Sequence, residues 1–133
     1  MGLFDKIKKF INEYCVTVLL EFAPRKVRRG GEIVVQVTVK ANEDVVIKKI
    51  FLSLKATEET KKNVNLYEKD IELETNIELK KDETKTYNTS LQIPSDAIQS
   101  WQGKHSAMNW YLLAKTETPG VSPDSGWEKF DVV

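Results

Sequence analysis

Short runs in which apolar and polar residues alternate recur along most of this chain, and they constrain its fold more than any other feature. The clearest run covers residues 32–40 and places a β-branched residue at every second position: Ile33, Val35, Val37 and Val39. Because successive side chains of a strand point to opposite faces, this run predicts a strand with one buried face. Runs of the same kind, separated by turn residues, predict an all-β protein of about seven or eight strands.

The other predicted strands follow the same alternation. They cover residues 14–22, 45–57, 66–79, 87–93, 107–118 and 127–133. The inward set of 45–57 changes parity at Lys48 and Lys49, which predicts a β-bulge. Residues 107–118 are apolar on both faces, so we expect this strand in the middle of a buried sheet. Residues 58–65 are charged and favour a surface loop, and 95–106 a long polar loop.

Length and composition are typical of one soluble domain. The 133 residues include 20 basic and 20 acidic side chains, so no net field attracts nucleic acid or a membrane to the whole molecule. Cys15 is the single cysteine, which excludes an intramolecular disulfide and favours a reducing compartment. No run approaches the roughly 20 apolar residues of a membrane span, and none resembles the core of a signal peptide. We therefore expect a cytoplasmic protein.

The first residues have a different period from the rest. Apolar side chains recur there at spacings of three and four: Leu3, Phe4, Ile7, Phe10 and Ile11. This pattern predicts an amphipathic helix over residues 1–13, followed by a β-sandwich domain over 14–133. The apolar face of such a helix must be covered, either by the sandwich, by a second subunit or by a membrane surface.

No pattern in the sequence indicates catalysis, so no catalytic, cofactor-binding or metal-binding residue is predicted. His105 is the only histidine and lies about ninety residues from Cys15 in sequence, so neither a metal site nor a Cys/His pair is favoured. Trp101, Trp110 and Trp127 could stack on single-stranded nucleic acid, but few basic residues accompany them, and packing is favoured.

A basic segment is the candidate binding site for a partner. It consists of Arg25, Lys26, Arg28 and Arg29. Arginine presents a planar fork that matches carboxylates and phosphates, so the segment could hold an acidic or phosphorylated protein segment or a membrane surface. The alternative is a solvated turn.

Two stretches resemble arrestin-like domains. The segment 31–39 opens with Gly31 and Glu32 before alternating valines, and Pro94 closes a later strand ahead of a glycine-containing loop and the aromatic-rich strand at Trp110 and Tyr111. The chain is similar to a single lobe, such as an arrestin N-terminal domain, and also to the bacterial sporulation-control proteins. Immunoglobulin-like domains are the structural competitor, but their paired cysteines are absent.

This resemblance implies a non-catalytic domain that binds or scaffolds proteins, with no cofactor and a protein partner of unknown identity. The alternative is a peripheral membrane-surface adaptor that uses the N-terminal helix. The terminal strand 127–133 carries few charges that would block edge pairing, so a homodimer formed edge to edge or through the helix is a further expectation.

Overall fold

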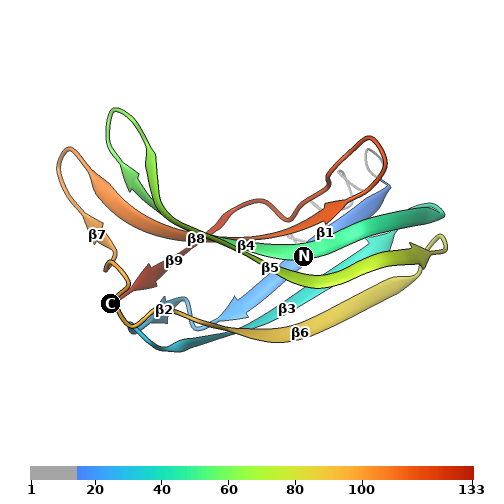
Figure 1. The fold of residues 1–133 in the computed structure, drawn as a ribbon, viewed down its shortest axis with the longest axis horizontal. Helices are drawn as coiled ribbons and strands as arrows, with labels where there is room; N and C mark the ends of the chain where they lie inside the picture. Colours follow the sequence, from blue (N-terminus) through green and yellow to red (C-terminus); the bar gives the residue numbers. More distant parts are fainter. Residues whose placement is uncertain (1–14) are drawn as a thin grey trace, which may run out of the picture.

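Nine strands make up the part of the chain that the computed structural model describes, residues 15–133 (Figure 1). They are β1 (Val16–Ala23), β2 (Lys26–Val27), β3 (Glu32–Ala41), β4 (Val45–Glu59), β5 (Val64–Leu79), β6 (Thr84–Gln92), β7 (Trp101–Gln102), β8 (Ala107–Glu117) and β9 (Glu128–Val132). The helix predicted over residues 1–13 lies outside the described residues.

The strands form two facing sheets, which gives the predicted β-sandwich (Figure 1). Among the described residues, one sheet has three strands in the order β1-β3-β6. The larger sheet has the order β2-β9-β8-β4-β5, with β7 also paired to β8. Pairing is antiparallel except between β2 and β9.

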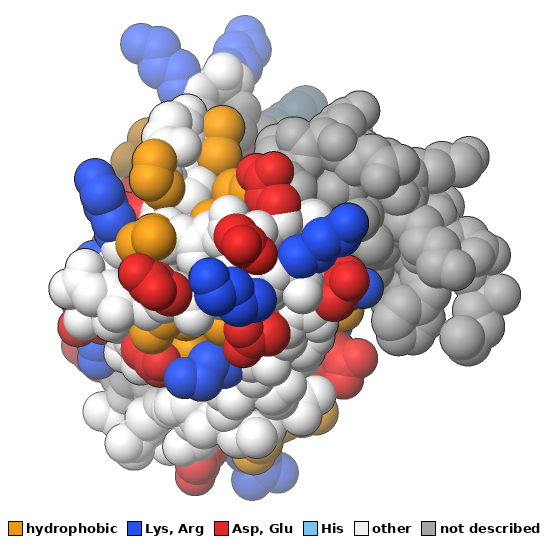
Figure 2. Space-filling model, turned by 90° about the vertical axis from the view of Figure 1, so that its right-hand side faces the viewer, with side chains coloured by type: hydrophobic (Ala, Val, Ile, Leu, Met, Phe, Trp, Pro, Cys, Tyr) orange, Lys and Arg blue, Asp and Glu red, His pale blue; other side chains and the backbone are white. Residues whose placement is uncertain are grey.

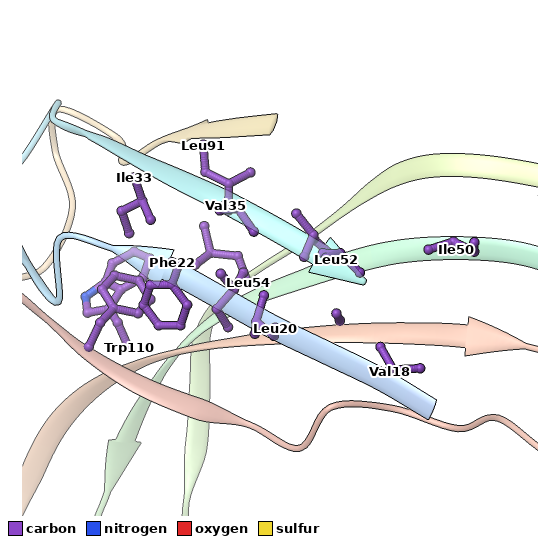
Figure 3. Close-up of a cluster of buried hydrophobic side chains, with 14 of the residues drawn as sticks. Val18, Leu20, Phe22, Ile33, Val35, Ile50, Leu52, Leu54, Leu91 and Trp110 are labelled. Atoms are coloured by element: carbon purple, nitrogen blue, oxygen red, sulfur yellow. The ribbon is translucent and has the colours of Figure 1, made fainter. Parts of the chain in front are cut away.

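The core lies between the sheets and is built by the alternation seen in the sequence. Every inward residue predicted for β3 is fully buried, as Figure 3 shows for Ile33 and Val35 beside Leu52 and Leu54 of β4. Trp110 of β8 is 1% exposed, and its ring lies 5.4 Å from that of Tyr67 and 6.2 Å from that of Phe130. As predicted, β8 is an interior strand.

The predicted bulge needs a correction of position. Ile47 and Ile50 are both fully buried, so the parity of β4 does change between them. The register shifts with β5, however, fall between Ile50 and Phe51 and between Ala56 and Thr57. Opposite the parity change, Asn76 of β5 adopts a left-handed φ of 52°.

Two predicted loops also contain strand. Glu58 and Glu59 extend β4 and pair with Met108 and Ala107, so the turn between β4 and β5 is shorter than the charged composition suggested. Charges are tolerated there because Glu59 accepts hydrogen bonds from Asn109 and Tyr111. The two-residue strands β2 and β7 lie in segments predicted as turn and loop.

The terminal strand is not the open edge that motivated the predicted homodimer. β9 pairs with β8 on one side and with β2 on the other, through Val27 and Val132. Among the described strands, the edges of the larger sheet are therefore β2, β5 and the two-residue β7. Residues 15–133 include no helix long and apolar enough to cross a membrane.

Candidate functional site

The described residues hold no metal-binding cluster, and they do not bring Cys15 and His105 together. Within residues 15–133, no cluster of three His, Cys, Asp or Glu side chains could hold a metal ion. His105 is exposed in the loop before β8, and Cys15 contacts the hydroxyl of Thr118 at 3.5 Å. The two residues that a Cys/His pair would need are thus held by different parts of the fold.

Two tyrosines have shifted pKa values, and both are tied to carboxylates. Burial is the main cause that raises the pKa of Tyr111 to about 12. The hydrogen bond that the Tyr111 hydroxyl donates to Glu59 is the second cause. Burial and the nearby Glu74 raise the pKa of Tyr87, which donates a hydrogen bond of 3.2 Å to Glu74. Both phenols therefore stay protonated as donors, which suits cross-strand contacts better than proton abstraction.

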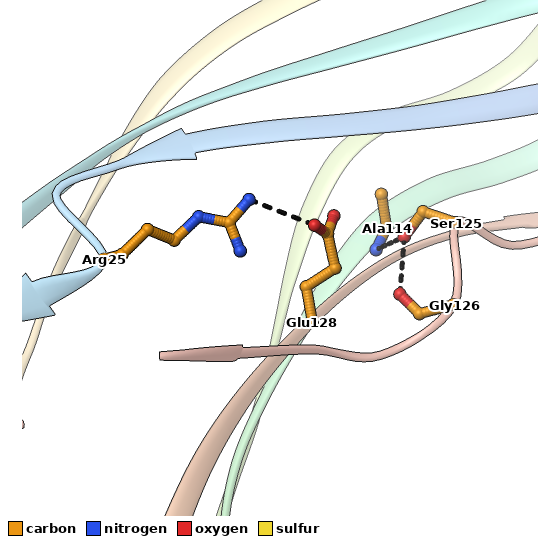
Figure 4. Close-up of polar contacts among 5 residues, drawn as sticks. All are labelled: Arg25, Ala114, Ser125, Gly126 and Glu128. Atoms are coloured by element: carbon orange, nitrogen blue, oxygen red, sulfur yellow. Dashed lines mark hydrogen bonds and ion pairs between the residues drawn. The ribbon is translucent and has the colours of Figure 1, made fainter. Parts of the chain in front are cut away.

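The structure divides the predicted basic site. Arg25 forms a salt bridge of 3.0 Å with Glu128, shown in Figure 4, and its guanidinium carbon lies 3.8 Å from the centre of the Phe22 ring. The Arg25 side chain therefore links the segment between β1 and β2 to β9. Lys26, Arg28 and Arg29 are exposed, and within residues 15–133 their side chains have no ion-pair partner.

The exposed arginines stand on a tight turn. Gly31 N–H donates to the carbonyl of Arg28 at 2.8 Å, and Gly30 has a φ of 72°. A glycine with positive φ at the third position is the signature of a type II turn. Arg28 and Arg29 thus occupy the first two positions of a turn, and both side chains are exposed there.

The outer face of the larger sheet carries a shallow groove of about 490 Å³. It is lined by Ser53, Leu54, Lys55, Asn65, Glu68, Lys69, Asp70 and Trp127. Trp127 is 44% exposed, and the ammonium of Lys55 lies 4.0 Å from its ring centre. Core packing or loop pinning was the prediction for the three tryptophans, and core packing is confirmed for Trp110, whereas Trp101 is 41% exposed on its loop.

The sheet edges differ in how well they are protected against pairing with another chain. β5 carries acidic side chains at Glu68, Asp70, Glu72 and Glu78, shifts register twice against β4 and has the left-handed Asn76. Charges, bulges and kinks of this kind prevent edge-to-edge association. β6 has few of these features: its register with β3 is continuous over 84–92, and its only charged residue is Lys85.

The hydrogen bonds at the two ends of the β3–β6 ladder show which groups of β6 face outward. Ala41 N–H donates to Glu83 O at 2.9 Å, and Ile93 N–H donates to Gly31 O at 2.8 Å. Backbone groups alternate in direction along an antiparallel strand, so the odd-numbered residues of β6 pair with β3. The even-numbered residues point their N–H and C=O groups away from it: Thr84, Thr86, Asn88, Ser90 and Gln92. No described strand pairs with this edge.

Comparison with known proteins supports the architecture. No family model matches the sequence, and the search of curated proteins gave no match. The crystal structure of Spo0M, a sporulation control protein from Bacillus subtilis, matches with a TM-score of 0.71 over 90% of this chain. The fold is that of an arrestin-like β-sandwich. Sequence identity is 15%, and the chain spans 49% of the Spo0M chain, so the match carries the fold alone.

The resemblance inferred from the motifs at Gly31 and Pro94 is thus confirmed for the fold. The open edge of β6 was missed by sequence reasoning, although its signal was readable. Residues 84–92 contain no proline and a single charge. A strand with few charges is unprotected if it lies at an edge, but the sequence does not say which strands are edges.

Proposed function

We propose that this chain is a non-catalytic protein-binding module that takes up an extended segment of its partner along the free edge of β6. The observation that supports the proposal is the row of outward backbone groups at Thr86, Asn88 and Ser90, on an edge with a single charge and no bulge. An added strand gains its affinity from main-chain hydrogen bonds and its specificity from pockets for alternate side chains.

The inner side of this edge defines the chemistry of the incoming segment. Glu74 of β5 accepts hydrogen bonds from Lys85 at 2.9 Å and from Tyr87, so β5 lies across the sandwich from β6. Ile71 and Leu73 of β5 are only partly buried against the core. Apolar side chains at every second position of the partner would cover this apolar surface. We therefore expect an extended segment with alternating apolar and polar residues.

β6 is favoured over the opposite edge of the same sheet. β1 is shorter, with eight residues, and Cys15 next to it contacts Thr118 in the connection that follows β8. Pairing along β1 would therefore be limited by neighbouring chain, whereas β6 offers nine residues.

Proline substitution tests the backbone contacts directly. Thr86→Pro removes one outward N–H and leaves the ladder with β3 intact, and proline is tolerated on edge strands. Thr86→Ala is the matched control because it keeps the N–H and removes the same hydroxyl. Ser90→Pro and Ser90→Ala repeat the comparison at the outward N–H four residues further along β6.

The assay uses ten-residue peptides selected by the full chain from a display library and then synthesised. We expect the proline variants to bind peptide about tenfold more weakly and the alanine variants to bind normally. The tenfold loss combines one hydrogen bond of about 1 kcal/mol with the steric clash of the proline ring. Peptide binding should also slow hydrogen exchange at the amides of Thr86, Asn88 and Ser90. Peptides that protect other amides, or that bind the proline variants normally, would show that the edge of β6 is not the site.

A further inference from the structure

Three loops and turns gather at the end of the sandwich that holds β2 and β7, at the left of Figure 1. They are residues 25–31, 60–63 and 94–106, which we call the loop end. Gly30 N–H donates to Pro94 O at 3.2 Å, which joins the first segment to the third. Across the larger sheet, Val64 pairs with Glu58, Glu58 with Met108, and Met108 with Trp101, which places the 60–63 turn in the same region.

Charge is distributed unevenly between this end and the rest of the molecule. The loop end contains seven basic residues and one acidic residue, Asp96, in a chain whose charges balance overall. Arg25 is paired with Glu128, and the remaining six cations are exposed: Lys26, Arg28, Arg29, Lys61, Lys62 and Lys104. The opposite end, which Figure 2 faces, mixes both signs, as in the contacts of Asp44 with Lys80 and with the backbone of Lys81.

Large apolar side chains are exposed among these cations. Ile98 is 42% exposed and Trp101 is 41% exposed, on the loop that leads into β8. Val64 and Leu66, next to the 60–63 turn, are also exposed. The loop end therefore exposes both cations and apolar side chains. A partner with an anionic surface over an apolar interior can contact the two together.

We infer that the loop end docks on a membrane surface that carries anionic lipid headgroups. Each lysine or arginine close to such a surface is attracted to it, and tryptophan prefers the boundary between headgroups and acyl chains. The six cations come from three separate segments at the same end as the exposed apolar side chains, an arrangement that fits a broad surface better than one acidic peptide. The inference is independent of strand addition at β6 and uses no residue of the N-terminal segment.

Sedimentation of the full chain with vesicles tests this contact. The vesicles contain either phosphatidylcholine alone or phosphatidylcholine with about one third phosphatidylglycerol. We expect binding only to the second kind, and weaker binding as the salt concentration rises. The double variant Arg28→Glu, Arg29→Glu should bind at least about thirtyfold more weakly, because both attractions are lost and repulsion replaces them.

Two controls separate the loop end from charge and hydrophobicity in general. Lys80→Glu, Lys81→Glu makes the same change in net charge at the opposite end and should leave binding unchanged. Trp101→Ala should weaken binding, whereas Trp127→Ala, which removes an equally exposed tryptophan on the outer sheet face, should not.

Several results would overturn the inference. They are absence of vesicle binding, equal binding to neutral vesicles, or equal losses in the two charge-reversal variants. Vesicle binding that survives the changes at Arg28, Arg29 and Trp101 would place the membrane contact elsewhere on the chain. Binding of polyglutamate through the same residues without vesicle binding would identify an acidic protein segment as the partner instead.

Discussion

Replacing Trp110 by phenylalanine should destabilise the fold because this side chain joins the core to the loop before β7. The indole is 1% exposed and packs against Tyr67 and Phe130. Its N–H donates a hydrogen bond of 2.7 Å to the carbonyl of Ile98, which holds residues 94–100 against β8. Phenylalanine keeps one aromatic ring but loses both the donor and part of the buried volume.

The expected loss follows from these two contributions. Losing a partly buried hydrogen bond costs about 1 kcal/mol, and the smaller ring leaves space that costs about 1–2 kcal/mol, less than the roughly 3–5 kcal/mol of a full Trp→Ala truncation. Together they give about 2–3 kcal/mol. For a domain of this size, that loss corresponds to a melting temperature lower by about 10 °C.

Urea unfolding followed by circular dichroism measures the change directly. Trp127→Phe is the control, since Trp127 is 44% exposed and its ring contacts the Lys55 ammonium, an interaction worth about 0.5–1 kcal/mol. We expect that variant to lose less than about 1 kcal/mol. A Trp110→Phe protein as stable as the wild type would refute the packing and hydrogen bonding described for Trp110.

Two further predictions concern a phenol and an arginine. The folded-state pKa of Tyr111 is raised from 10.0 to about 12, so its contribution to stability is complete below pH 10 and is lost as the pH rises towards 12. Urea titrations should show less of this alkaline loss in Tyr111→Phe than in the wild type, and an identical loss would contradict the contact with Glu59. Arg25→Ala should lower the free energy of unfolding by about 1 kcal/mol, through loss of its exposed salt bridge and its contact with Phe22. Arg28→Ala and Arg29→Ala should change that free energy by less than about 0.5 kcal/mol, and equal losses at all three positions would mean that Arg28 and Arg29 also stabilise the fold.

Sequence periodicity identified the buried faces because it is a local property of each strand. Ile33 and Val35 were placed inward from the alternation alone, and their burial confirms it. Which strands are neighbours in a sheet was harder to predict from the sequence, because pairing depends on contacts between distant segments. The two residues of β2 are too few to show alternation, yet their pairing with β9 removes the open edge expected at the C-terminal strand.

The sequence identified which residues could bind a partner, but it did not show which of them instead stabilise the fold. The basic segment was recognised from its composition, but its separation into a structural Arg25 and exposed Arg28 and Arg29 depends on Glu128, which is about a hundred residues further along the chain. Similarly, Trp101, Trp110 and Trp127 are equivalent in composition. Only the sheet pairing distinguishes the buried Trp110 of the interior strand β8 from the two exposed rings.

The two proposed surfaces use different properties of the sandwich and can act together. Strand addition needs a long, regular edge, and β6 supplies one because charge and bulges are concentrated on β5, across the sandwich. Membrane docking needs cations and apolar side chains on projecting turns, which the loop end supplies. Since the turns lie at one end of the sandwich, a bound lipid surface would leave the middle of β6, around Asn88, free to pair. A variant with Thr86→Pro should therefore bind peptide more weakly and keep vesicle binding, and the Arg28→Glu, Arg29→Glu variant should show the reverse. Loss of both activities in either variant would mean that the two surfaces are one site.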